Sequence, residues 1–148
     1  LHYMEQAWLS FSVENYAGKL HDKLSYKKYY FIDNGIISLF KEGSLGELLE
    51  NLVAINLRRK YGQDFYYYKH NTEVDFYMPN EHMAIQVCYS LQEEETRIRE
   101  TAALTAIHRF IPLKSAIIVT YDEETEFQTD EDLSITVIPI WKWLLLNE

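Results

Sequence analysis

Alternating hydrophobic and polar residues predict where the strands of this chain lie. Residues 8–14 alternate in the manner of a half-buried strand. Residues 27–32 form a β-rich run that ends at the turn signal Asp33-Asn34-Gly35. Residues 115–121 are apolar on both faces, which is typical of a strand covered on both sides. Further strands are predicted over residues 65–69, 73–78, 83–91 and 133–140.

Two long segments have the pattern of amphipathic helices. Residues 44–61 begin with the capping-box pair Ser44 and Glu47 and end just before Gly62, a residue that suits a helix C-cap. Residues 93–111 form the second long helix. Shorter helices are predicted over residues 1–8 and 141–146. The order from residue 44 is α-β-β-β-α-β-β-α, which predicts an α/β fold with a mixed sheet flanked by helices.

The charge of the chain limits its function. Its 148 residues are 47% hydrophobic and 25% charged, as in an ordinary globular domain. Residues 1–74 hold 9 basic and 9 acidic groups, whereas residues 75–148 hold 5 and 14, which gives the net charge of −9. Because affinity for nucleic acids depends on neutralising phosphates, a free-standing DNA-binding protein is not expected. Any such contact would use a basic strip, either Lys27-Lys28 or Arg58-Arg59-Lys60.

Other features of the sequence bear on the cellular compartment of the protein and on whether the chain is a piece of a longer one. The acidic run within residues 122–132 is predicted to be a solvated loop. Cys88 is the single cysteine, which excludes an intrachain disulfide and fits a cytoplasmic protein. Because the chain begins inside a predicted helix, with Leu1 in place of Met, we expect a piece of a longer protein. The sequence has no P-loop run, so this segment is not expected to bind ATP.

Two predicted strands each carry polar side chains on one face. In the strand over residues 73–78, Asp75 lies on the polar face, and Val74 and Phe76 are expected on the other. In the strand over residues 83–91, the polar face is formed by every second residue from Gln86. A turn over residues 79–82 joins the two strands, so their polar faces are expected to lie side by side.

These polar faces form a candidate site. If Asn80-Glu81 is a two-residue hairpin loop, the numbers of paired residues sum to 161, and Asp75 lies opposite Gln86. Cys88 shares the face of Gln86, and Glu50 adds a carboxylate from the helix. Two carboxylates are the minimum set for Mg²⁺, which prefers oxygen ligands. Glu50, Asp75, Gln86 and Cys88 are therefore the candidate catalytic positions.

Three segments in this order resemble a known prokaryotic family. They are KKYYFIDNGIISLF, GELLENLVAINLRRKYG and FYYYKHNTEVDFYMPNEHMAIQVCYSL, and the resemblance runs from about residue 29 to residue 143. The family is the nuclease-like domain of unknown function that follows the ATPase module in many bacterial and archaeal AAA-type ATPases. It is similar in fold to the PD-(D/E)XK, or restriction-endonuclease-like, nucleases. The resemblance implies such a domain over residues 44–148, and a helix and strand extension over residues 1–43 that connects to an upstream, ATP-binding module.

The resemblance also assigns roles to the candidate residues. Glu50 matches the helix glutamate and Asp75 the metal-binding aspartate, but Gln86-Val87-Cys88 stands where the family has E-x-K. Gln86 keeps an oxygen without a charge, and Cys88 lacks the cation that orients the attacking water. Glu50, Asp75 and Gln86 are thus expected to hold Mg²⁺ or Mn²⁺ weakly, if at all. Candidates to replace the lost groups are Ser90, Gln92 and Arg97.

Three interpretations of function remain open. In the first, the domain has a degenerate metal site and serves recognition of DNA or a protein partner beside its own ATPase. In the second, it is an active Mg²⁺- or Mn²⁺-dependent nuclease with Glu50, Asp75 and Gln86 as ligands. In the third, it is a structural scaffold between domains. Cleavage that is lost in Asp75→Asn would distinguish the second from the other two.

Overall fold

The computed structural model describes residues 2–17, 26–40 and 44–147. Its strands are β1 (Ser10–Val13), β2 (Lys28–Phe31), β3 (Tyr66–Lys69), β4 (Glu73–Met78), β5 (Met83–Val87), β6 (Ser115–Thr120), β7 (Thr125–Gln128) and β8 (Ser134–Pro139). Its helices are α1 (His2–Gln6), α3 (Asn34–Phe40), α4 (Leu45–Tyr61), α5 (Glu94–Phe110) and α6 (Ile140–Leu146). Within these residues the chain forms a six-stranded mixed sheet, ordered β3-β4-β5-β6-β8-β7, and a two-stranded antiparallel sheet of β1 and β2.

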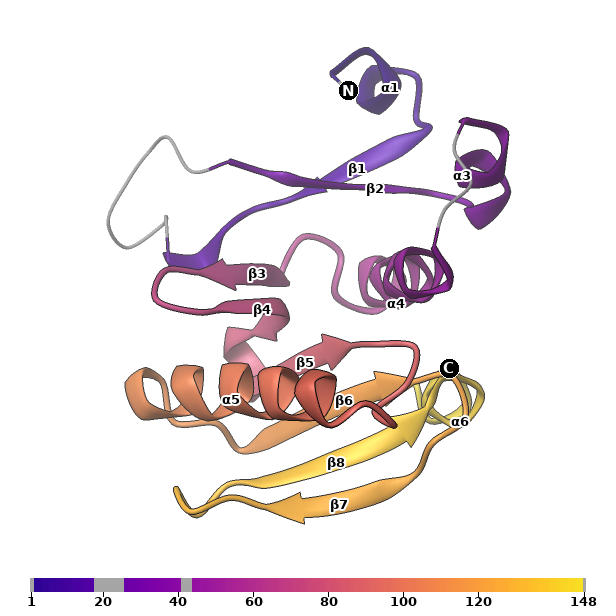
Figure 1. The fold of residues 1–148 in the computed structure, drawn as a ribbon. Coiled ribbons are helices and arrows are strands. Elements are labelled where there is room, and N and C mark those ends of the chain that lie inside the picture. Colours follow the sequence, from indigo (N-terminus) through magenta and orange to yellow (C-terminus); the bar gives the residue numbers. More distant parts are fainter. Residues whose placement is uncertain (1, 18–25, 41–43, 148) are drawn as a thin grey trace.

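Helices cover both faces of the six-stranded sheet (Figure 1). On one face, α4, α6 and the β1–β2 sheet enclose a core that contains Val53, Phe76 and Ile85. On the other face, α5 encloses a second core that contains Leu104 and Ile118. The predicted mixed α/β architecture is therefore confirmed. None of the described helices combines the length and the apolar character that crossing a membrane requires.

The acidic segment contains a strand that the sequence pattern did not predict. Residues 125–128 form β7, an edge strand that pairs antiparallel with β8. Its residues are exposed except for Phe127, which is half-buried. An edge strand with one paired side and little buried surface has no apolar alternation, so the prediction of a loop was wrong over these residues.

The caps of α4 agree with the sequence pattern. Ser44 Oγ accepts a hydrogen bond of 3.2 Å from the Glu47 backbone N–H, as in a capping box. Gly62 follows the last turn at φ 63°, and its N–H donates to the Arg58 carbonyl. A positive φ is one that residues with a Cβ rarely adopt, which explains the glycine at this position.

The two glycines of this helix are expected to respond in opposite ways to replacement by alanine. Gly62→Ala should lower the free energy of unfolding by about 1 kcal/mol, because the left-handed conformation penalises a Cβ. Gly46→Ala should raise it by about 0.5 kcal/mol, because alanine favours the helix. There is room for the added methyl group, since a Cβ at this position would lie 3.9 Å from Ser44 Oγ. Urea unfolding of both variants measures this difference. Destabilisation of equal size in both would contradict the conformational explanation.

The register between β4 and β5 is the predicted one. Phe76 pairs with Ile85 and Tyr77 with Ala84, so the numbers of paired residues sum to 161. The connection differs from the predicted two-residue loop, because Pro79–Glu81 form a 3₁₀ turn. His82 follows at φ 51° and completes a four-residue loop. The predicted two-residue loop and the observed four-residue loop are both centred between Asn80 and Glu81. They therefore pair the same residues of β4 and β5.

Candidate functional site

Four charged side chains from three elements converge near the start of β4. Lys28 Nζ on β2 lies 2.9 Å from Glu73 Oε1 and 3.7 Å from Asp75 Oδ1, both on β4, and 3.8 Å from Glu50 Oε1 on α4. The side chain of Asp75 is 17% exposed and that of Lys28 is 24% exposed. We call Lys28, Glu50, Glu73 and Asp75 the carboxylate–lysine cluster. Its charges lie close enough, and are buried enough, to determine one another's protonation.

A β-bulge in β4 directs Asp75 into this cluster. Tyr66 on β3 pairs with Tyr77, but Tyr68 pairs with Val74, so three steps along β4 oppose two steps along β3. The extra residue breaks the alternation of side chains along β4. Bulges of this kind occur often beside functional sites, where they redirect a side chain.

The bulge corrects one prediction from the sequence. Val74 packs in the core beneath α5, whereas Phe76 packs in the core beneath α4. The two residues therefore do not share a face, and the prediction that they do was wrong. Asp75 and Phe76 instead both lie on the side of α4 and β2, where Phe76 contacts the ring of Tyr30 with centroids 5.5 Å apart.

Asp75 and Gln86 lie on adjacent strands and bridge them beyond their last paired residues. Asp75 Oδ2 accepts a 2.9 Å hydrogen bond from the Val87 N–H. Gln86 Oε1 accepts a 2.7 Å bond from the Asp75 N–H, and its Nε2 donates to the Glu73 carbonyl at 3.3 Å. Gln86 is buried, and both ends of its amide contact the backbone of β4. The Gln86 amide therefore takes the place of backbone hydrogen bonds between β4 and β5, beyond the point where their regular pairing ends.

Hydrogen bonds from β2 and α4 fix the remaining side of the cluster. The Tyr30 hydroxyl donates to Glu50 Oε1 at 2.7 Å. Burial, and then the charge of Glu50, raise the pKa of Tyr30 well above its ordinary value, so the phenol remains a donor. Asn51 is buried on α4; its Oδ1 accepts from the Phe31 N–H and its Nδ2 donates to the Phe31 carbonyl. These bonds hold β2, and with it Lys28, against α4.

Burial and neighbouring charges shift the pKa values within the cluster. Burial, followed by repulsion from Glu50, raises the pKa of Asp75 to about 7, although Lys28 and the Val87 N–H act in the opposite direction. Burial alone would lower the pKa of Lys28, but Asp75, Glu50 and Glu73 raise it above its ordinary value. The hydrogen bond from Lys28 is the main cause that lowers the pKa of Glu73. Asp75 thus titrates near neutral pH.

Cys88 lies in a different environment from the cluster. It is buried in the core beneath α5, on the opposite face of the sheet from α4. Burial raises its pKa to about 12, with further contributions from Glu100, Glu123 and Asp75. The thiol therefore stays protonated and supplies neither a cation nor a thiolate at neutral pH.

The residues that were expected to replace the lost groups contact other parts of the molecule. Ser90 Oγ donates to Glu123 Oε1 at 2.7 Å. Among the described residues, neither Gln92 nor Arg97 has a side-chain contact with the cluster. The structure thus joins Glu50 and Asp75 through Lys28, brings Gln86 to the backbone beside them, and leaves Cys88 on the other face.

Lys28 was not predicted to be a site residue, but only to be part of a basic strip with Lys27. A signal was present, because Lys28 and Tyr30 are two residues apart on a predicted strand and therefore share a face. The large aromatic ring of Tyr30 indicates that this face of the strand is the buried one. A lysine on a buried face requires a partner of opposite charge, and Glu50 and Asp75 were already candidates for a buried site.

Comparisons with known proteins give a family and one long relative. The family described as a domain of unknown function, DUF4143, matches residues 45–143. The uncharacterized protein MJ1544 of Methanocaldococcus jannaschii is 36% identical over 156 residues, which cover 98% of this chain and 35% of that protein. The chain thus spans about a third of the length of this relative. No solved structure matches the chain.

Proposed function

Since the chain belongs to the DUF4143 family, we propose that it is a nuclease-like accessory domain of a prokaryotic AAA-type ATPase. In this proposal the domain has a restriction-endonuclease-like fold and a degenerate metal site, and it serves recognition of a nucleic acid or protein partner in the cytoplasm. The observation that carries the proposal is the position of the Lys28 ammonium, within 4 Å of the carboxylates of Glu50, Glu73 and Asp75.

The residues of the cluster do not fit a resident divalent ion. Mg²⁺ needs oxygen ligands at about 2.0–2.1 Å in octahedral geometry. Lys28 already lies among the carboxylates and forms a 2.9 Å ion pair with Glu73. The Gln86 amide is bonded to the backbone at both ends. Over residues 2–17, 26–40 and 44–147, no group of three His, Cys, Asp or Glu side chains is arranged to hold a metal ion.

The arrangement of elements supports the nuclease-like part of the proposal. Asp75 and Gln86 lie on neighbouring antiparallel strands, and Glu50 reaches the same place from the helix before them. This is the arrangement that the resemblance to PD-(D/E)XK nucleases implies. The bulge at Asp75 adds a feature that is common beside active sites. A domain that kept this arrangement of two strands and a helix while losing its metal would retain a surface suited to the recognition of a nucleic acid or protein partner.

The place of the domain in a larger ATPase is also a proposal. MJ1544 extends well beyond the region that aligns with this chain, which leaves room for an ATPase module. Such a module is the proposed partner of the domain and the proposed site of ATP binding. The net charge of −9 favours a protein partner over a free nucleic acid.

One observation favours the alternative of an active nuclease. Lys28 supplies a cation 3.7 Å from Asp75, although Cys88 occupies the position of the family's lysine. An active Mg²⁺- or Mn²⁺-dependent phosphodiesterase would therefore use Lys28 in place of that lysine.

Calorimetric titration with Mn²⁺, combined with cleavage assays, tests the proposal. We expect no saturable binding in the wild type or in Asp75→Asn below millimolar Mn²⁺, and no cleavage of single-stranded, duplex or branched DNA. The reason is that Lys28 competes for the carboxylate oxygens. Asp64→Asn, which removes an exposed carboxylate outside the cluster, is the matched control. Saturable binding and cleavage that are lost in Asp75→Asn but kept in Asp64→Asn would establish the active nuclease instead.

A further inference from the structure

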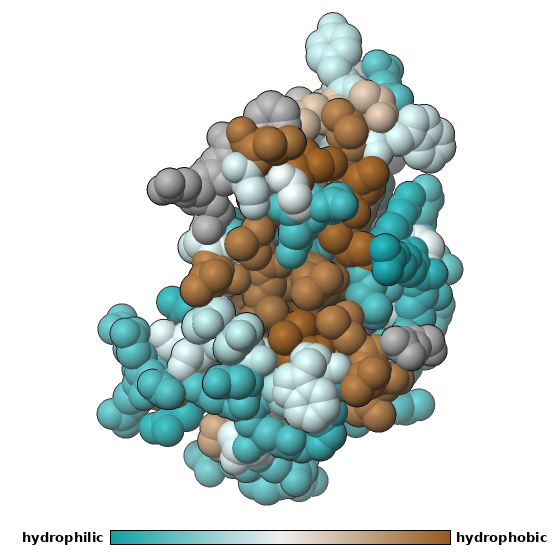
Figure 2. Space-filling model, turned by 90° about the vertical axis from the view of Figure 1, so that its right-hand side faces the viewer, coloured by the Kyte–Doolittle hydropathy of each residue, from teal (hydrophilic) through white to brown (hydrophobic). Residues whose placement is uncertain are grey.

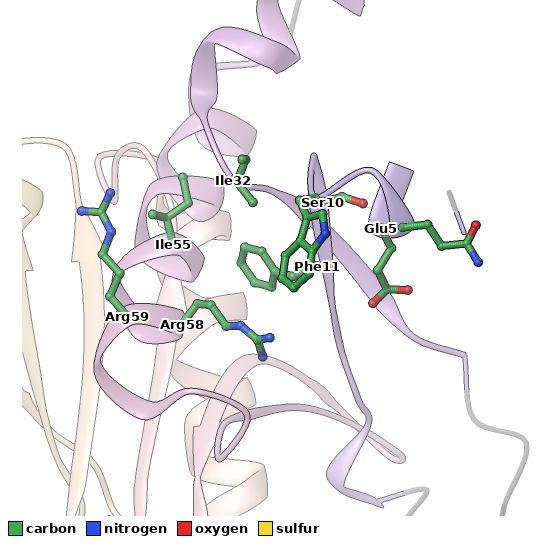
Figure 3. Close-up of a pocket in the computed structure, with 9 residues that line it drawn as sticks. Glu5, Ser10, Phe11, Ile32, Ile55, Arg58 and Arg59 are labelled. Carbon is green, nitrogen blue, oxygen red and sulfur yellow. The ribbon is translucent and has the colours of Figure 1, made fainter. Parts of the chain in front are cut away.

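A pocket between α1, β1 and α4 has features that the packing of the described residues leaves unexplained. Its volume is about 590 Å³, within the range of small-molecule sites. We propose that it binds a small amphipathic carboxylate, meaning an alkyl chain or aromatic ring that ends in a carboxylate. Figure 3 shows side chains that line the pocket, including those of Phe11, Ile55 and Arg59. The proposal is independent of the carboxylate–lysine cluster.

The body of the pocket is apolar. Phe11 belongs to the core, and Ile55 packs against that core from α4. Ile32 also lines the pocket and is 48% exposed, so its apolar surface is incompletely covered. Figure 2, which views the molecule from the side of α3 and α4, shows that hydrophobic side chains gather on this face. An alkyl chain or ring would remove this surface from water.

Trp8 lines the same pocket in a conformation that bulky residues rarely adopt. Its φ is 60°, and the residue is 84% exposed. Strained backbone of this kind is concentrated at ligand clamps and switch regions. The exposed indole would gain an apolar partner if a ligand occupied the pocket.

Two polar groups of the pocket, the exposed Arg59 and the buried Ser10, have no hydrogen-bond partner within the part of the chain that the structure describes. In the part of the chain that the structure describes, no acceptor contacts the Arg59 guanidinium, whereas neighbouring Arg58 donates to the Gly62 carbonyl. Ser10 is buried in the pocket wall, and among the described residues its Oγ has no hydrogen-bond partner.

The charges around the pocket indicate a ligand with a single negative charge. Arg58, Arg59 and Lys60 form a cationic strip in a chain whose net charge is −9. The planar guanidinium matches the geometry of a carboxylate, with which it forms two parallel hydrogen bonds. Glu5 also lines the pocket, and it would repel a phosphate or another anion of higher charge.

Displacement of a fluorescent anilinonaphthalene sulfonate dye by octanoate tests the proposal on the chain as it is. We expect saturable displacement, which Arg59→Gln weakens by about tenfold for octanoate but leaves unchanged for the uncharged analogue octanol. Lys60→Gln removes the same charge from the same helix outside the pocket, and it should change the affinity by less than about twofold. Ile55→Trp should block both ligands by filling the pocket. Urea midpoints of each variant show that the fold is retained.

Three results would overturn the proposal. The first is the absence of saturable displacement at millimolar octanoate. The second is an equal loss of affinity in Arg59→Gln and Lys60→Gln, because this would mean that only the general charge of the helix matters. The third is a dimer of this chain, seen by light scattering and dissociated by Ile55→Trp, because the pocket would then be covered by a second copy.

Discussion

Replacing Lys28 by methionine is expected to lower the free energy of unfolding by about 2–3 kcal/mol at pH 8. The variant keeps most of the side-chain volume but leaves Glu50, Glu73 and Asp75 without the cation that all three contact. Loss of one partner from a buried ion pair costs about 3–5 kcal/mol, and the 24% exposure of Lys28 reduces this figure. Urea unfolding of wild type and variant at pH 8 gives the difference.

Lys27→Met is the matched control for this experiment. Lys27 precedes Lys28 directly, is 47% exposed, and lies 3.7 Å from the equally exposed carboxylate of Glu14. Its removal should cost about 0–1 kcal/mol, as for a surface ion pair. In Lys28→Met, Mn²⁺ should partly restore stability, because the freed carboxylates gain a cation. Similar losses in both variants, with no effect of Mn²⁺, would contradict a central role for Lys28.

Asp75→Asn is expected to remove a pH dependence of stability between pH 5 and pH 7. In the folded protein burial and Glu50 raise the pKa of Asp75 to about 7, above the ordinary value of 3.8. A raised pKa in the folded state means that this group stabilises the fold at low pH and loses that contribution as the pH rises through 7. Relative to Asp75→Asn, the wild type should therefore lose about 2.5 kcal/mol between pH 5 and pH 7.

Urea unfolding of wild type and Asp75→Asn at several pH values measures this difference. Subtracting one curve from the other removes the contribution of every group that titrates alike in both proteins. Asp64→Asn provides the control for the loss of one carboxylate, because Asp64 is exposed and lies outside the cluster. A curve for Asp75→Asn that runs parallel to that of the wild type would mean that Asp75 titrates at its ordinary pKa, and that the cluster does not retain a proton on it near neutral pH.

Local patterns were sufficient to predict much of the fold. The helix over 45–61 carries its signals in adjacent residues, from the Ser44 cap to Gly62, and the structure reproduces both ends. The strands β4 and β5 are joined by a short loop, so their register follows from the numbering of a few residues. Both elements depend on interactions between neighbours in the sequence, which is why one sequence is enough to find them.

The candidate site was less predictable, because it depends on contacts between distant segments. Glu50, Asp75 and Gln86 were identified from their chemistry and from a resemblance. Lys28 reaches them from a strand that belongs to another sheet. Its spacing from Tyr30 indicates that Lys28 lies on the buried face of that strand, but no local pattern shows which carboxylates it contacts. The bulge in β4 likewise arises from pairing with β3, and it invalidated the simple alternation on which the faces of Val74 and Phe76 were predicted.

The two outer strands of the six-stranded sheet bear on how a protein partner could dock. At β3, the side chain of Asn15 bonds both backbone groups of Lys69, and the Tyr67 N–H donates to the Glu14 carbonyl. At β7, the exposed strand lies in an acidic segment whose charges would repel another copy of itself. The edge at β3 therefore already has hydrogen-bond partners within the chain, and the edge at β7 repels a second copy through its negative charge. Both features disfavour aggregation and the addition of a strand from another protein. A partner is directed to the helical surfaces of the molecule, where side chains determine specificity.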